Sequence, residues 1–298
     1  MSENTFKEVL LYGADAVNAV FAIRPQAIRR AWFDEERVKD FTEICKWLAT
    51  EKRSYSTGTD ADLRGIIGHS RHDGVVVMTE RPPIGAPKLS DITAWREANE
   101  AVVYVTKTAD AHQLAAIARI AASMGVKRLL LDDVSADAAF ASSAWSESRG
   151  AMEHLRLYRV TGPGGFLKLI EDKYHIIGVV REGGRNPDYS TPVRVPGRSP
   201  LLLVGGGPNG IDPDLISRCA YLLHVPSRGV TPVSLLNTAD CVAHFLPWLT
   251  SKTKKTPGEG FRTRMKEAKE AKAAARVANA PKKTASSFRT EESGETAE

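Results

Sequence analysis

The chain has 298 residues, a net charge of +5 and a hydrophobic content of 42%. This length can hold two domains with separate cores, and the composition is that of a globular protein rather than of a fibrous or low-complexity chain. No apolar run is long enough to span a bilayer and the N-terminus lacks a signal-peptide pattern, so we expect a cytoplasmic protein without a membrane partner.

Residues 6–80 have the pattern of a small α/β domain, because short apolar strands alternate with helices that have one apolar face. The expected elements are an amphipathic segment, a strand, a helix, a strand, a helix and a strand, over residues 6–20, 29–34, 38–50, 54–57, 60–67 and 75–78. His69 and His72 precede the last strand without a third His or Cys nearby, so we expect a polar turn there and no metal site.

Residues 81–98 are rich in proline and polar residues, which is typical of a linker. Over residues 99–250, near-continuous apolar strands alternate with helices, and this pattern predicts a parallel sheet that is covered on both faces. The expected strands cover residues 101–105, 128–131, 175–180, 201–204 and 221–225, and the expected helices cover residues 112–124, 166–172 and 234–246.

Two of these strands end in small residues. The run Leu201–Val204 stops at three glycines with Gly210 close behind, and the run ending at Val225 stops at Pro226. Without side chains in the way, backbone N–H and C=O groups can meet at one point, which suits a ligand bound through the main chain, such as an adenosyl group. No Lys-Ser/Thr pair follows, so the glycines are not a phosphate-binding P-loop. A strand-to-helix connection without a ligand is the alternative.

Residues 251–298 contain 12 Lys and Arg against 7 Asp and Glu, whereas the preceding residues are balanced. We expect a disordered basic tail that either attracts phosphates or improves solubility. Three cysteines, Cys45, Cys219 and Cys241, are far apart in apolar contexts and are expected to be reduced, buried thiols.

The glycine-rich segment resembles the C-terminal half of the SpoU (TrmH-type) RNA 2′-O-ribose methyltransferases. That family reads Gly-x-Glu-x-x-Gly, then a strand ending in Ile-Pro, then Ser-Leu-Asn at the start of the last helix. The resemblance implies a trefoil knot over Leu201–Leu246, and a bulky residue at Gly205 is then expected to exclude the cofactor while the domain stays folded. It also implies that S-adenosylmethionine is held at Gly205, Gly210, Val225, Leu235, Leu236 and Asn237.

Residues 110–126 resemble the family's first motif, in which an arginine follows an Asn-Leu/Val-Gly-Ala core on one helix. Arg119 has the spacing of that arginine from Gln113, and it is the only charged residue between Gln113 and Val126. The resemblance implies that Arg119 is catalytic and helps to deprotonate the ribose hydroxyl. A structural ion pair is the alternative. Gln113 replaces the family's Asn, Ala115 replaces its Gly, and Gly207 replaces the acidic residue of the glycine-rich motif.

Two shorter motifs extend the resemblance over residues 8–250. Tyr12-Gly13-x-x-Ala16-Val17 and the turn at residues 72–74 resemble the small substrate-binding domain that precedes the knot in the family, and residues 148–153 resemble its Gly-Ala-x-Glu turn. The expected order is a substrate-binding domain, a linker, a parallel-sheet trefoil-knot (SPOUT) methyltransferase domain and a tail, over residues 6–80, 81–98, 99–250 and 251–298.

The resemblance implies an enzyme that transfers a methyl group from S-adenosylmethionine to a ribose 2′-hydroxyl of rRNA or tRNA. It also implies a homodimer that needs no metal. Because Gly207 stands where the family has an acidic residue, the alternative is an RNA-binding protein that retains the methyltransferase fold with weak or no turnover.

Overall fold

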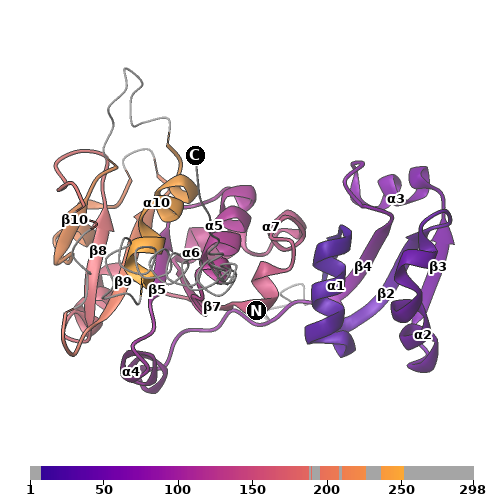
Figure 1. The fold of residues 1–298 in the computed structure, drawn as a ribbon, viewed down its shortest axis with the longest axis horizontal. Coiled ribbons are helices and arrows are strands. Elements are labelled where there is room, and N and C mark those ends of the chain that lie inside the picture. The colour runs from indigo at the N-terminus through magenta and orange to yellow at the C-terminus, as the bar shows by residue number, and fades with distance from the viewer. Residues whose placement is uncertain (1–7, 188, 190–194, 208–209, 226–235, 252–298) are drawn as a thin grey trace, which may run out of the picture. The chain divides into compact units, whose positions relative to one another are not determined.

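The computed structural model describes residues 8–187, 189, 195–207, 210–225 and 236–251. Their strands form one sheet of four strands and one of six (Figure 1). The predicted α/β class is confirmed, with a small N-terminal domain followed by a parallel-sheet domain. The expected tail lies outside the described residues. The predicted knot depends on the path of residues 226–235, which also lie outside them, and it stays a prediction.

The four-stranded sheet has the order β1-β4-β2-β3. β4 pairs antiparallel with both β1 and β2, and β2 pairs parallel with β3. Its elements are β1 (Glu8–Tyr12), α1 (Ala14–Ile23), a 3₁₀ helix (Pro25–Ala27), β2 (Ile28–Asp34), a second 3₁₀ helix (Val38–Phe41), α2 (Thr42–Thr50), β3 (Ser54–Gly58), α3 (Asp60–Ile67) and β4 (Val75–Glu80).

The amphipathic segment over residues 6–20 is divided at Gly13 into the strand β1 and the helix α1. Gly13 has a φ of +89°, a left-handed conformation that favours glycine and lets the chain turn directly from strand to helix. Leu11 on β1 and Val17 on α1 are both buried in the same core cluster, so apolar residues recur on both sides of the break.

The six-stranded sheet has the order β10-β8-β9-β5-β6-β7, and every pairing in it is parallel. The central strands β5 and β9 are buried almost throughout, as the continuous apolar runs predicted. The strands are β5 (Val102–Thr106), β6 (Arg128–Leu131), β7 (Arg156–Arg159), β8 (Tyr174–Val179), β9 (Ser199–Gly205) and β10 (Tyr221–Leu223).

Helices cover both faces of this sheet (Figure 1). One core cluster joins α5 and α10 to the side chains of Val103, Val105 and Leu202, and the other joins α4, α8 and α9 to those of Tyr104, Leu201 and Leu203. The helices are α4 (Leu89–Glu97), α5 (Ala111–Ser123), α6 (Asp133–Ala138), α7 (Ser142–Glu147), α8 (Pro163–Ile170), α9 (Pro213–Ile216) and α10 (Thr238–Thr250), with a 3₁₀ helix at Ala151–His154. None of the helices in the described ranges is long and apolar enough to cross a membrane.

The segment over residues 81–98 is more than the expected linker. Its second half forms α4, whose Ile92 and Trp95 are buried against the six-stranded sheet. The proline and polar content of the first half concealed this helix, because the helix offers few apolar side chains to the core. The connection that lies outside helices and strands is therefore residues 81–88.

A bidentate ion pair links the N-terminal domain to the 3₁₀ helix after α7. The Arg24 guanidinium donates hydrogen bonds of 2.5 and 2.7 Å to the two carboxylate oxygens of Glu153, whose side chain is only 3% exposed. Nearby, the backbone N–H of Tyr12 donates to Ser146 Oγ over 3.0 Å. A bidentate arginine–carboxylate contact fixes the orientation of the two side chains as well as the distance between them, so it aligns β1 and α1 with the α7 region.

Candidate active site

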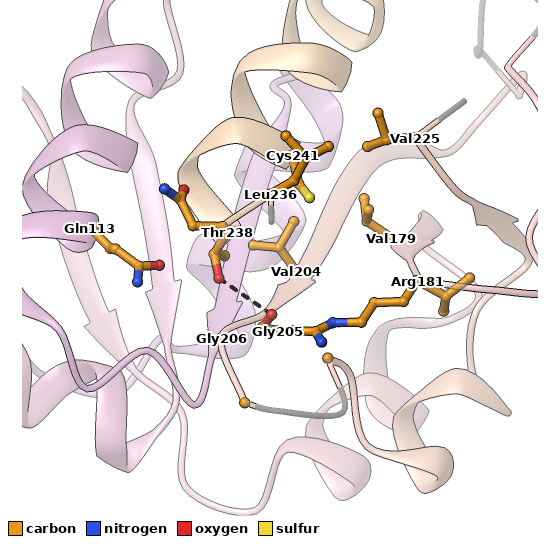
Figure 2. Close-up of a pocket in the computed structure, with 14 residues that line it drawn as sticks. Gln113, Val179, Arg181, Val204, Gly205, Gly206, Val225, Leu236, Thr238 and Cys241 are labelled. Atoms are coloured by element: carbon orange, nitrogen blue, oxygen red, sulfur yellow. Dashed lines mark hydrogen bonds between the residues drawn. The ribbon is translucent and has the colours of Figure 1, made fainter. Parts of the chain in front are cut away.

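A cavity of about 210 Å³ opens at the carboxyl ends of β8 and β9 and beside the start of α10 (Figure 2). The carboxyl ends of parallel strands are the edge at which open α/β sheets usually bind ligands. Fourteen described residues line the cavity: Gln113, Val179, Val180, Arg181, Val204, Gly205, Gly206, Gly207, Gly210, Val225, Leu236, Asn237, Thr238 and Cys241.

Five of the six residues expected to hold a cofactor meet in this cavity: Gly205, Gly210, Val225, Leu236 and Asn237. The sixth, Leu235, lies outside the described residues. The sheet brings Gly205 and Val225 to the same edge because β9, β8 and β10 are parallel, so their carboxyl ends lie on one side. Asn237 also begins α10. Its side-chain oxygen accepts from the Asp240 N–H over 3.0 Å, and the Asp240 carboxylate accepts from the Asn237 N–H over 2.9 Å.

Gly205, the last residue of β9, and Gly206 after it are required by close packing. A Cβ atom on Gly205 would lie 2.5 Å from the carbonyl carbon and oxygen of Gly210, and one on Gly206 would lie 2.4 Å from Thr108 Oγ1. The Gly205 carbonyl accepts a 3.3 Å hydrogen bond from Thr238 Oγ1, which ties this loop to α10 (Figure 2). The loop is thus held in place before any ligand enters.

The expectation that Gly205 tolerates a bulky residue conflicts with this packing. We instead expect Gly205→Ala to destabilise the domain by about 1–3 kcal/mol, because backbone atoms must move to accept the methyl group. Urea-induced unfolding would measure the loss. Gly165→Ala is the matched control, since a Cβ on this α8 glycine meets nothing within 4 Å. Equal midpoints for both variants would contradict the packing argument.

Gly207 differs from its two glycine neighbours. A Cβ atom there would meet only ordinary contacts, with Lys107 Cδ at 3.4 Å and the Gly210 carbonyl oxygen at 3.7 Å. Packing therefore does not demand glycine at the position where the family has an acidic residue. The Lys107 ammonium instead pairs with Asp212 Oδ1 at 2.5 Å.

Several residues of the cavity carried no individual signal in the sequence. Val179 ends β8 and Val180 and Arg181 follow it, whereas Thr238 and Cys241 lie on the first turn of α10. Burial raises the pKa of the Cys241 thiol, which therefore stays protonated near neutral pH and is a wall of the cavity rather than a nucleophile. Burial also raises the pKa values of Cys45 and Cys219, and all three thiols are free and half-buried.

Arg119 lies apart from this cavity. Its side chain is exposed on α5, and Nη1 donates a hydrogen bond to the backbone oxygen of Glu147. It forms no ion pair within the part of the chain that the structure describes, so the structural ion pair considered from the sequence is not found there. Arg119 instead lines a second cavity of about 820 Å³ together with Arg71, Arg149 and Glu147.

Glu147 joins groups from both domains beside this second cavity. Its carboxylate lies 2.8 Å from Arg71 Nη1 and 2.5 Å from His112 Nδ1. His112 lies on the first turn of α5. Gln113 of this helix lines the first cavity and Arg119 lines the second, so one helix reaches both cavities. The arrangement offers a cavity lined by apolar side chains and main-chain groups at one end of α5, and charged side chains further along it.

The two histidines before β4 form a polar turn, as expected. His69 Nδ1 accepts from the Arg71 N–H, and His72 Nδ1 accepts from the Gly74 N–H, each over 3.2 Å. No group of three or more metal-ligating side chains occurs among the residues that the structure describes.

The fold and the first cavity define a two-domain α/β protein whose second domain has a glycine-walled ligand site at the carboxyl edge of a parallel sheet. The chain belongs to the SpoU rRNA methylase family, whose profile matches residues 100–246. A second profile, described as RNA 2′-O ribose methyltransferase substrate binding, matches residues 10–84. The resemblance found in the sequence is confirmed.

Curated relatives and solved structures agree with this assignment. The chain is 27% identical over 150 residues to an uncharacterized tRNA/rRNA methyltransferase, YfiF, of Escherichia coli O157:H7. The aligned region covers 50% of this chain and 42% of that protein. It is 23% identical over 180 residues to an uncharacterized tRNA/rRNA methyltransferase of Haemophilus influenzae. That aligned region covers 60% of this chain and 50% of that protein. The chain thus spans about half the length of the curated relatives it matches.

The fold is similar to that of the SpoU methyltransferase AviRb from Streptomyces viridochromogenes in complex with the cofactor AdoMet. The TM-score is 0.64 at 20% identity, over 84% of this chain and 93% of that chain. An AdoMet-bound rRNA methyltransferase from Sinorhizobium meliloti gives a TM-score of 0.63 at 14% identity, over 84% and 89% of the two chains.

Proposed function

We propose that this protein transfers a methyl group from S-adenosylmethionine to a ribose 2′-hydroxyl of rRNA or tRNA. The observation that carries the proposal is the glycine-walled cavity at the carboxyl ends of β8 and β9. Membership of the SpoU family and the similarity to structures with bound AdoMet support the same reading.

The cavity fits an adenosyl ligand in its chemistry. Val179, Val204, Val225 and Leu236 provide apolar surface for a purine ring, whereas the glycine loop and the start of α10 provide main-chain polar groups. Contacts through the main chain depend little on side-chain identity. The cofactor site can therefore persist although Gly207 and Gln113 depart from the family pattern.

When bound, S-adenosylmethionine supplies an electrophilic methyl group. The chain's own part is to hold that ligand and the RNA in one orientation, which by itself can lower the barrier substantially. Gln113 lies at the cofactor end of α5, and Arg119 lies six residues further along. We assign to Arg119 the role of holding the RNA backbone near the reacting ribose. An arginine is always protonated in proteins, so it acts on the hydroxyl through a phosphate and not as a free base.

RNA is the partner we propose for the charged second cavity, because its three arginines can contact phosphates. By analogy with the family, we also propose a homodimer and a cytoplasmic location. The basic segment over residues 252–289 would add salt-dependent affinity for RNA through released counterions.

A methyl-transfer assay tests the function. Incubation of the full chain with unmodified rRNA or tRNA and S-[methyl-³H]adenosylmethionine should label RNA, and nuclease digestion should recover the label in a 2′-O-methylnucleoside. Label on a base would contradict the ribose assignment. Binding of both cofactor and RNA without transfer would instead favour the alternative raised by Gly207, a binding protein that has lost turnover.

A further inference from the structure

Arg181 is the one ionised side chain among the fourteen described residues that line the first cavity. It follows the end of β8 by two residues, and its side chain extends toward the glycine loop (Figure 2). The other lining residues are apolar side chains, glycines, an amide pair, a hydroxyl and a protonated thiol. The cavity therefore has a single positive charge at its edge.

No carboxylate of the described residues forms an ion pair with this charge. Asp212, which follows the glycine loop and precedes α9, is paired with Lys107. The family position that would add an acid to this loop is Gly207. The Arg181 charge also acts on Cys241, which lines the cavity. It lowers the pKa of this thiol, whereas burial and Asp240 raise it by more.

We propose that Arg181 binds the carboxylate of the amino-acid end of S-adenosylmethionine and makes the site selective for carboxylated adenosyl ligands. This inference rests on the proposed function. A guanidinium offers a planar pair of donors that matches a carboxylate. Without its carboxylate the ligand retains two positive groups, a sulfonium and an ammonium, and both would lie in the cavity that Arg181 borders.

The test compares the affinities of the full chain for two ligands, measured by isothermal titration calorimetry. One is S-adenosylmethionine and the other is decarboxylated S-adenosylmethionine, which differs only in lacking the carboxylate. The wild-type chain should bind the first about tenfold or more tightly, as expected for loss of a charge-assisted hydrogen bond. Arg181→Gln should reduce this ratio to within about twofold, mainly by weakening binding of S-adenosylmethionine, and Arg181→Lys should retain part of it.

Arg185→Gln is the matched control. Arg185 belongs to the same segment and is exposed, but it stacks on Tyr221 at 5.6 Å and does not line the cavity, so its variant should keep the wild-type ratio. The role of Arg181 would be overturned, and the proposed function left intact, by either of two results. One is equal affinity of the wild-type chain for the two ligands, and the other is an affinity ratio in Arg181→Gln as large as that of the wild type. Failure of the wild-type chain to bind either ligand would overturn both.

Discussion

A tryptophan at Cys241 should strongly weaken binding of S-adenosylmethionine while the protein remains folded. Cys241 lines the cavity from the first turn of α10 and is half-buried, so an indole placed there fills space that the adenosyl group needs. Overpacking of a preformed site costs about 1–3 kcal/mol, which corresponds to a loss of about fivefold to 150-fold in affinity. Isothermal titration would measure the change.

Two controls separate steric exclusion from general damage to α10. Ala243→Trp adds the same ring two residues later, where the helix faces solvent, and should leave the affinity unchanged. Cys241→Ser keeps the size of the side chain and should bind nearly as the wild type does. Equal loss in Cys241→Trp and Ala243→Trp would show general damage to α10 and contradict steric exclusion, and full binding by Cys241→Trp would show that the ligand site lies elsewhere.

Replacing Arg119 with alanine should remove methyl transfer and spare cofactor binding. Arg119 lines the second cavity and is absent from the lining of the first, so its loss should act on the RNA and not on S-adenosylmethionine. Removing one preorganised group that stabilises the transition state typically lowers kcat by about a hundredfold to a thousandfold. Single-turnover transfer of the tritiated methyl group, alongside calorimetry of cofactor binding, would report both quantities.

Arg156→Ala is a suitable control for the lost charge, because Arg156 is an exposed arginine on β7 that lines neither cavity. It should transfer methyl groups at close to the wild-type rate. If Arg119→Ala instead weakened cofactor binding as strongly as it slowed transfer, the separation of the two cavities along α5 would be wrong.

The parallel sheet and most of the cofactor site could be predicted from the sequence because both depend on local patterns. Continuous apolar runs identified the buried strands β5 and β9, and their glycine and proline ends identified Gly205, Gly210 and Val225 as neighbours. The strand-to-helix break at Gly13 was concealed, since apolar side chains recur on both sides of it.

Other site residues depend on geometry that the pattern does not contain. Arg181 and Cys241 enter the cavity because of how β8 and α10 are placed, and their sequence neighbours show nothing unusual. The position of Arg119 relative to Gln113 could have been read from helix geometry. Six residues at about 100° each place the two side chains about 240° apart around the helix, so they face different cavities.

Calorimetric titration of the full, unmodified chain with S-adenosylmethionine tests the central claim most directly. The cavity between the glycine loop and α10 predicts saturable binding at one site per chain, with a negative heat-capacity change because the apolar wall is buried by the ligand. Absence of any heat of binding at millimolar cofactor would contradict the proposal that this cavity is a cofactor site.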